Sequence, residues 1–413
     1  MNINNTRANA NNNIGLRPAL SAMPSGPCGQ GFAVRLTEKG ALFLAGRQKI
    51  NIKAATSSIF DANVAALFER RQAVPKTYGN LWGQIVDIEN LYCAYLAARD
   101  KKREKSEVLS YDSHREENLI IAQNELIWHT WSPKPYRQFE VHEPKRRLIH
   151  APQFSDRVIH HALVRVIEPL FERKMIFHSF ACRKGLGTHN AVATAEMFAR
   201  KMAAKYGQYY FLKGDIHHYF PSINHEALKN IIRRTIRDKD VLWLINKIID
   251  ESGFPGVGLP IGTLTSQLFA NVYLDSLDHH MKDVLGVKHY LRYMDDFIVF
   301  SNDKGELRTL LNETRQWLSD NLKLQLNGKT RIVSQSEGLD FCGYRIWPAY
   351  RLPRKRNVTR MRRRMKKLCK RYRRGAIPAE NVKAAWASFL GYMKHCNGHK
   401  TKFKIWQELN NLI

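Results

Sequence analysis

The stretch HYLRYMDDFIVF, residues 289–300, places Asp295 and Asp296 between two runs of aromatic and β-branched residues. Such runs are typical of buried strands, and the acidic pair between them predicts a tight turn. Adjacent carboxylates in apolar surroundings repel each other and lose solvation, whereas a divalent cation such as Mg²⁺ would stabilise them. An acidic pair in a turn is more often simply solvated, so the rest of the chain must decide between these two interpretations.

A third carboxylate stands at a second predicted strand end. Residues 209–216, YYFLKGDI, predict a strand that ends near Asp215, and a sharp turn containing Phe220 follows. One acid at a strand end, followed along the chain by a strand-turn-strand with two more, is the order of acids in the palm of a two-metal polymerase. This order favours a metal-binding role for Asp295 and Asp296.

The charge of the chain indicates a polyanionic partner. Its 413 residues include 66 Lys and Arg against 37 Asp and Glu, which gives a formal net charge of +29. Nucleic acid is favoured over a membrane surface, because no apolar run approaches the roughly 18–20 residues of a membrane span. No signal peptide opens the chain, and the six scattered cysteines are typical of reduced thiols. We expect a cytoplasmic protein.

Three stretches set the organisation of the chain. Residues 1–75 are expected to form a largely disordered extension, since Asn, Gly and Pro are frequent and no chemistry is recognisable. Apolar residues at helical spacing between Leu81 and Trp131 predict helices, which we expect to pack beside a sheet. Alternation over Leu322–Asn327 predicts a further strand after the acidic hairpin.

Two basic regions could bind phosphate. Residues 139–150 predict a hairpin with Lys145 and Arg147 near its tip, which is either a solvated basic turn or a clamp for a triphosphate. Residues 351–374 hold fourteen Lys or Arg and no acid, with apolar residues along one helical face. Such a run repels itself unless a phosphate backbone neutralises it. We therefore predict that this helix binds nucleic acid through Arg354, Lys355, Arg356, Arg360, Arg362, Arg363, Arg364, Lys366 and Lys367.

In order along the chain, five features resemble the motifs of reverse transcriptases: Asp215 with Phe220, a glycine-rich loop before Ser266, YMDD at 293–296, Lys329, and FCGY at 341–344. YMDD alone is a weak signal, but the ordered series is specific, and it covers about residues 77–413. The resemblance implies an α+β right-hand polymerase. It assigns N-terminal helices and fingers to 76–208, the palm with part of the fingers to 209–349, and a basic helical thumb to 350–413.

The glycine-rich loop indicates a subclass. Retroviral and group II intron enzymes usually have Gln where this chain has Ile261, and Pro where it has Gln267. The variant resembles reverse transcriptases of diversity-generating retroelements, encoded by bacteria or phages. These enzymes copy a template-repeat RNA into cDNA with errors at adenines, so that a target gene is diversified, and they act with a small basic helical accessory protein. The first ~22 residues resemble translated template repeat.

Two alternatives remain open. The first is a retron or group II intron-type reverse transcriptase, against which Ser266 and Gln267 argue. The second is an RNA-binding scaffold with a polymerase fold but no activity, against which the presence of all three acids argues. We expect no RNase H or nuclease domain after the last helices, so that template removal and integration would need other proteins.

The resemblance also implies roles at the metal site. Asp215 and Asp295, with the carbonyl group of Ile216, would bind two Mg²⁺ ions, and Asp296 would orient the metal shell. Lys329 would donate a proton to the leaving pyrophosphate.

The remaining implied roles concern the incoming dNTP. Lys145 and Arg147 would bind its triphosphate, and Phe220 would exclude a 2′-hydroxyl group so that the product is DNA. Ile261 and Gln267 would lie at the nucleotide. Because the side chain of Ile261 cannot form hydrogen bonds, we expect weaker selection against mispaired nucleotides and a low fidelity.

Overall fold

The computed structural model describes residues 77–142 and 146–410. The predicted extension 1–75 and Lys145 lie outside these residues. None of the helices in the described ranges has an apolar stretch long enough to cross a membrane.

A four-stranded antiparallel sheet holds the three acidic residues singled out above. Its strand order is β4-β5-β3-β6, with bounds β4 Tyr290–Tyr293, β5 Asp296–Ser301, β3 Tyr210–Asp215 and β6 Arg331–Ser334. The predicted hairpin at residues 289–300 is confirmed, because β4 and β5 pair antiparallel across the turn at Met294 and Asp295. The predicted strand before Asp215 is confirmed as well.

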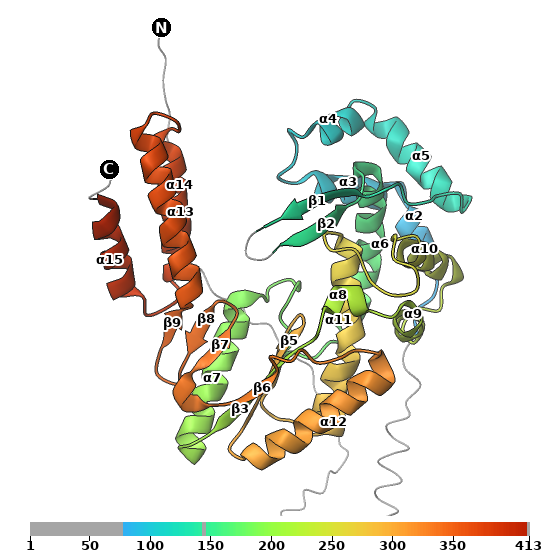
Figure 1. Cartoon of the computed structure of the whole chain (residues 1–413). Helices are drawn as coiled ribbons and strands as arrows, with labels where there is room; N and C mark the ends of the chain where they lie inside the picture. The colour runs from blue at the N-terminus through green and yellow to red at the C-terminus, as the bar shows by residue number, and fades with distance from the viewer. Residues whose placement is uncertain (1–76, 143–145, 411–413) are drawn as a thin grey trace, which may run out of the picture. The chain divides into compact units, whose positions relative to one another are not determined.

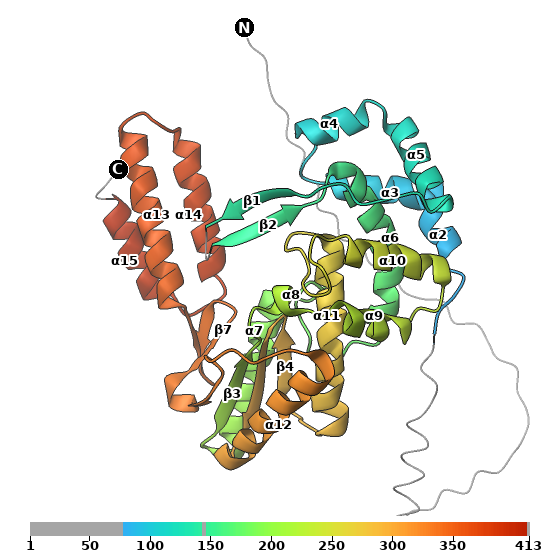
Figure 2. The ribbon, with the colours of Figure 1, turned by 45° about the vertical axis from the view of Figure 1, so that its right-hand side comes forward.

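Helices cover both faces of this sheet. Alternate residues of a strand point to opposite faces. Accordingly, Phe211 and Ile298 pack with helix α7 (Thr188–Tyr206), whereas Leu212 and Val299 share a core with α11 (Leu264–His279) and α12 (Lys304–Leu322). Figure 2 shows the sheet between these helices. The strands are buried on both sides, which explains their nearly continuous apolar sequences.

The N-terminal helices pack on another helix, which corrects one expectation. They are α2 (Trp82–Val86), α3 (Ile88–Arg99), α4 (Ser106–Asp112) and α5 (Arg115–Ile127), and each contacts α6 (Phe154–Glu172). Helix α6 in turn packs on α11 (Figure 1). The expectation that these helices lie beside a sheet is wrong, because their apolar faces are buried against the largely apolar surface of α6.

A two-stranded sheet and three short helices complete this part of the chain. Strands β1 (Arg137–Val141) and β2 (Arg147–Ala151) form an antiparallel hairpin that leaves much of its surface exposed. Helices α8 (Tyr219–Ser222), α9 (His225–Arg233) and α10 (Lys239–Asp250) connect β3 with α11. A π-helical segment, His280–Val284, extends the end of α11.

The C-terminal residues form a small sheet and three helices. A 3₁₀ turn at Gln335–Glu337 leads into the antiparallel sheet of β7 (Leu339–Phe341), β8 (Tyr344–Ile346) and β9 (Arg351–Pro353). Helices α13 (Lys355–Arg373), α14 (Ala379–Met393) and α15 (His399–Asn410) then pack together around Met365, Cys369, Phe389, Met393, Ile405 and Leu409. The basic run at 351–374 is therefore helical over most of its length, as predicted.

The strand predicted at Leu322–Asn327 is wrong. Leu322 is the last residue of α12, and Lys323 ends that helix in the left-handed conformation with φ +52°. Of the following residues, Leu326 forms only an isolated bridge with Ile216, and the next strand of the sheet begins at Arg331. The backbone groups of this loop bond instead to the end of β3, as described below.

Candidate active site

Asp215 and Asp296 are brought side by side by strand pairing. Asp215 is the last residue of β3 and Asp296 the first of β5, and the two are directly opposed in the antiparallel register. Gly214 makes this pairing possible, because a Cβ atom there would lie 2.1 Å from the ring of Phe297. The two strand ends that the sequence predicted separately, at Asp215 and at Asp296, therefore lie together in one site.

The turn between β4 and β5 holds the third acid. Met294 has φ +54°, a left-handed conformation that is uncommon for residues other than glycine. The backbone N–H of Ile216 donates a hydrogen bond to the carbonyl oxygen of Asp295 at 3.3 Å. The turn is thus tied to the residue that follows Asp215, so that the three acids come from adjacent backbone segments.

The loop between α12 and β6 fixes the end of β3 and carries Lys329. The N–H of Asn327 donates to the carbonyl oxygen of Asp215 at 2.7 Å, and the N–H of His217 donates to that of Gln325 at 2.8 Å. The Asp215 N–H donates to the Thr330 hydroxyl at 3.2 Å. Lys329 lines the same cavity as Asp215 and Asp296, which has a volume of about 670 Å³. The structure therefore brings these three predicted residues together.

The electrostatics of the site fit a divalent cation. The pKa of Asp296 is raised to about 6, mainly because burial desolvates the carboxylate and also because of the charges of Asp295 and Asp215, while Lys213 and Arg354 oppose the rise. Among the described residues no three His, Cys, Asp or Glu side chains are grouped closely enough to hold a metal ion by themselves. Mg²⁺, however, is commonly bound by one or two carboxylates together with substrate phosphate oxygens. The donor set is therefore suited to a metal that arrives with a nucleotide.

The same cavity holds Lys213, which the sequence analysis did not single out, and Arg354, which it assigned to nucleic-acid binding and not to this site. Lys213 lies two residues before Asp215 on β3, and its ammonium group donates to the carbonyl oxygen of Asp340 at 2.7 Å. Arg354 forms an ion pair with Asp340 at 2.5 Å. The two-residue period of a strand could have placed Lys213 on the face of Asp215. No sequence pattern could have indicated Asp340, because Lys213 comes from another sheet and Arg354 lies beyond two further strands of the small sheet.

A second group of predicted residues is joined by backbone contacts. Arg147 is the first residue of β2, and the N–H of His150 on the same strand donates to the carbonyl oxygen of Ile261 at 2.9 Å. Gly262 permits this contact, because it has φ +124° and an added Cβ would lie 2.8 Å from the Ile149 side chain. The glycine-rich loop is therefore docked on the hairpin of Arg147.

The glycine-rich loop also contacts the turn after β3. The N–H of Leu259 donates to the carbonyl oxygen of Phe220 at 2.9 Å, and Phe220 is partly buried against the main core. Gln267 lies in the first turn of α11, which Thr263 caps by accepting from the N–H of Ser266 at 3.0 Å. Phe220, Gln267, Arg147 and Ile261 do not line the cavity of Asp215 and Asp296.

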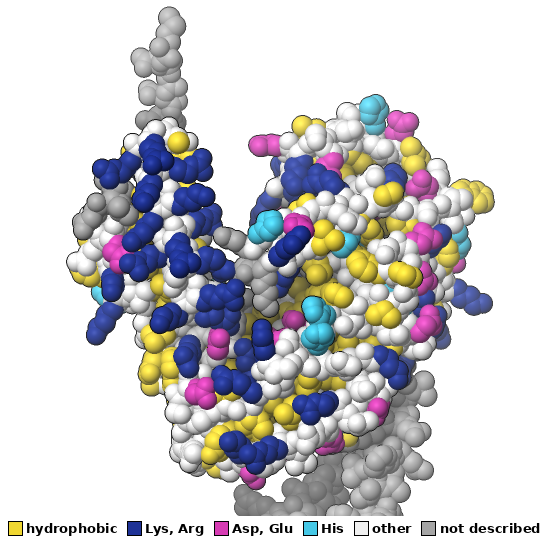
Figure 3. Space-filling view, viewed as in Figure 1, with side chains coloured by type: hydrophobic (Ala, Val, Ile, Leu, Met, Phe, Trp, Pro, Cys, Tyr) yellow, Lys and Arg dark blue, Asp and Glu magenta, His cyan; other side chains and the backbone are white. Residues whose placement is uncertain are grey.

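The predicted nucleic-acid-binding cations on and before α13 divide into two sets. A surface hollow is lined by Lys355, Arg356, Arg360, Arg363, Arg364 and Lys367. By contrast, Arg362 and Lys366 form ion pairs with Glu408 of α15, and Arg354 pairs with Asp340. Figure 3 shows Lys and Arg side chains gathered over α13 and α14.

Comparison with known proteins gives the family. Residues 133–346, more than half of the chain, match the family model described as reverse transcriptase (RNA-dependent DNA polymerase). Protein YkfC of Escherichia coli is 26% identical over 271 residues, which cover 55% of this chain and 71% of YkfC. The group II intron-encoded protein LtrA of Lactococcus lactis subsp. cremoris is 23% identical over 308 residues, 57% of this chain and 50% of LtrA.

A retron protein is similar as well. The retron Ec73 reverse transcriptase of Escherichia coli is 27% identical over 225 residues, which cover 50% of this chain and 67% of that protein. The chain thus spans about half of LtrA and about two thirds of the retron enzyme. The mixed helix and sheet architecture is the right-hand polymerase fold expected of the family. With the family match over most of the residues that form the sheet and its covering helices, this chain belongs to the reverse transcriptases, the RNA-dependent DNA polymerases.

Proposed function

We propose that this chain copies a template-repeat RNA into error-prone cDNA by two-metal nucleotidyl transfer, with Asp215, Asp295 and Asp296 as the metal-binding residues. The observation that carries the proposal is the direct pairing of Asp215 with Asp296 beside the Asp295 turn, in a cavity lined by cations. RNA-directed DNA synthesis is the activity of the family, and such a site holds charges that a metal–nucleotide complex would balance.

The acids would hold Mg²⁺ together with the triphosphate. Two Mg²⁺ ions bound there would lower the pKa of the primer 3′-hydroxyl group and neutralise the leaving pyrophosphate. Asp215 and Asp295, with the Ile216 carbonyl group, are the proposed ligands, and Asp296 orients them. Lys329 lies in the same cavity as Asp215 and Asp296, which supports its role as proton donor to the pyrophosphate.

Nucleotide selection is assigned to the second group of residues. Arg147 binds the triphosphate, together with Lys145, and Phe220 stacks below the sugar and excludes the 2′-hydroxyl group. Both are linked to the glycine-rich loop of Ile261 through its backbone contacts. Gln267 completes this side of the site. Template RNA and cDNA bind along α13, and a small basic helical protein is the proposed partner.

The proposal for the mutagenic subclass depends on Ile261. Its backbone is held by His150, while its side chain offers no hydrogen bond to a nucleotide. A polar side chain that would select strongly against a mispaired nucleotide is therefore missing at this position. We predict that Ile261→Gln lowers the misincorporation rate roughly tenfold. The measurement is deep sequencing of cDNA, with Ile261→Leu as the matched control, and an unchanged error spectrum in Ile261→Gln would contradict the prediction.

Primer extension on an RNA template, with Mg²⁺ and dNTPs, tests the function directly. We expect Mg²⁺-dependent cDNA with errors concentrated opposite template adenines, and at least a ~10³-fold lower rate for Asp295→Ala. Accurate cDNA would instead support a retron or group II intron-type enzyme, which the similarity to LtrA and the retron protein favours. If no cDNA forms even with the cognate RNA and accessory protein, an RNA-binding scaffold is the better description.

A further inference from the structure

A fully buried ion pair lies beside the turn that carries Asp295. Arg292, on β4, and Asp278, on α11, are both completely inaccessible to solvent. The guanidinium group of Arg292 binds the carboxylate of Asp278 through two nitrogens, with Nε–Oδ1 at 2.7 Å and Nη2–Oδ2 at 2.6 Å. This is the bidentate geometry in which Arg and a carboxylate bind most strongly.

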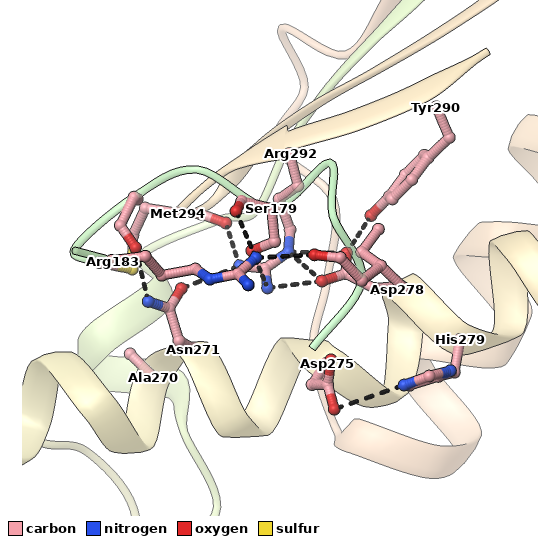
Figure 4. A network of polar contacts seen from close by, with 12 residues as sticks. Ser179, Arg183, Ala270, Asn271, Asp275, Asp278, His279, Tyr290, Arg292 and Met294 are labelled. Carbon is pink, nitrogen blue, oxygen red and sulfur yellow. Dashed lines mark hydrogen bonds and ion pairs between the residues drawn. The ribbon is translucent and has the colours of Figure 1, made fainter. Parts of the chain in front are cut away.

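The remaining donors of Arg292 are also used. Nη2 donates to the hydroxyl group of Ser179 at 3.0 Å, and Nη1 donates to the side-chain oxygen of Asn271 at 3.3 Å. Nη1 also donates to the carbonyl oxygen of Met294 at 2.9 Å (Figure 4). The hydroxyl group of Tyr290 donates to Asp278 at 2.6 Å. One guanidinium group thus connects α11, the segment around Ser179 and the turn after β4.

Stability alone gives a weak reason for such a pair. Removing two charges from water is costly, and replacing a buried ion pair by apolar residues is often neutral or stabilising. An apolar pair of similar volume could fill the space of Arg292 and Asp278, but it could not donate to the Met294 carbonyl group. The contact with the turn is therefore the feature that requires Arg.

The position of that contact matters for the site. Met294 directly precedes Asp295 and holds a left-handed backbone conformation, φ +54°, which surrounding contacts must maintain. On the other side of the turn, the Ile216 N–H bonds the Asp295 carbonyl group. Rotation of the Met294 peptide would move the Asp295 carboxylate relative to Asp215 and Asp296.

We infer that Arg292 is a positioning residue that sets the location of the Asp295 carboxylate by holding the Met294 carbonyl group. The inference rests on the proposed metal-binding function of Asp295. Asp278 orients Arg292, while Ser179 and Asn271 fix the plane of its guanidinium group. None of the four touches the reacting atoms, so their effect on catalysis passes through the geometry of the turn.

Two variants separate positioning from folding. Arg292→Lys keeps the charge beside Asp278, but its single ammonium nitrogen cannot form the bidentate pair and reach the Met294 carbonyl group at the same time. Arg292→Met combined with Asp278→Leu removes the ion pair without leaving a lone buried charge. Lys229→Met is the matched control. Lys229 is also buried and paired, with Asp250 at 2.7 Å and Glu226 at 3.0 Å, on helices α9 and α10 away from the turn. Thermal unfolding establishes that each variant is folded.

The first readout is single-turnover and steady-state primer extension. Because a displacement of about 1 Å at a reacting group can lower a rate roughly a hundredfold, we expect a fall of that order in kcat for both Arg292 variants. KM for the primer–template should change less than about twofold, since the contacts that bind it are intact. Lys229→Met should keep the kcat of the unmodified protein.

The second readout does not require catalysis. Tb³⁺ bound at the carboxylates can be detected by luminescence excited through nearby tyrosine rings such as Tyr293, with Asp295→Asn marking loss of the site. We expect both Arg292 variants to bind Tb³⁺ about tenfold more weakly, as is usual when a group that orients a ligand is removed.

The outcomes distinguish the positioning role of Arg292 from the proposed function of the chain. If the unmodified protein makes no cDNA but Tb³⁺ affinity falls in the Arg292 variants, the proposed function fails and the positioning role stands. If the unmodified protein is active and both variants retain its kcat and its Tb³⁺ affinity, the positioning role is overturned and the function stands. Equal losses in Lys229→Met would also overturn it, because any buried ion pair would then matter as much.

Discussion

Arg292 and Asp296 are charged residues on neighbouring strands of one hairpin, yet their surroundings differ in kind. Arg292 has a carboxylate partner and polar acceptors for its remaining donors, all within the protein. Asp296 is half-buried beside two further acids, and its pKa is raised to about 6 although Lys213 and Arg354 oppose the rise. A balanced cluster is complete without a ligand. A half-buried carboxylate whose pKa is raised by desolvation and by neighbouring acids is stabilised when a cation binds.

The Arg292–Asp278 pair and the acids at the candidate metal site also contribute differently to the protein. The balanced pair fixes backbone positions and has no group available for a substrate. The raised pKa of Asp296 shows that its ionised form is destabilised in the folded protein, so the folded protein gains stability when a cation binds beside it. The Arg292–Asp278 pair and the proposed metal-binding acids thus lie on opposite sides of one turn. The Met294 carbonyl group, which accepts from Arg292 and directly precedes Asp295, connects them.

The raised pKa of Asp296 predicts how stability depends on pH when metal is removed. Because the folded-state pKa of Asp296 is raised above the usual value for Asp, its ionised form destabilises the folded protein above about pH 6, and this penalty is lost as the pH falls. Between pH 7 and pH 5 the free energy of unfolding should therefore rise by about 1.3 kcal/mol relative to Asp296→Asn, which is close to a tenfold change in the unfolding equilibrium.

Chemical denaturation in EDTA measures this difference. Mg²⁺ with a nucleotide should stabilise the unmodified protein at pH 7 more than it stabilises Asp296→Asn. Parallel stability curves for the two proteins from pH 7 to pH 5 would show that the ionised Asp296 carboxylate does not destabilise the folded protein, which would contradict the difference from Arg292.

Local sequence patterns were sufficient for the elements that carry the acids. The hairpin at 289–300 and the strand before Asp215 were predictable because apolar β-branched and aromatic runs specify buried strands strongly. The helix at 355–373 was predictable for a related reason, since its apolar residues recur at helical spacing. Even the order of the acids along the chain indicated one site, which strand pairing then forms.

Contacts between distant segments were not predictable in this way. The alternation at Leu322–Asn327 looks like a strand, but the helix before it ends at Lys323 and the loop bonds to the end of β3. The apolar faces of α2–α5 revealed that they are buried, not that α6 covers them. The role of Arg292 is invisible in the sequence, where it is one Arg in an apolar strand, because Asp278 comes from another element.

On the surface, helix α13 also carries two kinds of cations, those that pair with an acid and those that line a hollow. Here we expect a smaller effect of substitutions. The run 351–374 contains no acid, which suggested that all its cations are unbalanced, but Glu408 of α15 pairs with Arg362 and Lys366. Arg363 and Arg364 line the surface hollow instead. If unbalanced cations are the ones that bind phosphate, Arg363→Gln with Arg364→Gln should weaken primer–template binding roughly fivefold at moderate salt.

Arg362→Gln with Lys366→Gln is the matched control, since it removes the same charge from the same helix. Fluorescence anisotropy over a range of salt concentrations separates the two pairs. Loss of two phosphate contacts should reduce the slope of log affinity against log salt by about two for Arg363 and Arg364, and by much less for the pair held by Glu408. Equal reductions would mean that net charge alone governs binding. A larger reduction for Arg362 and Lys366 would mean that Glu408 orients them towards the phosphates. Cations that are paired with an acid would then contribute to nucleic-acid binding as well as to the fold.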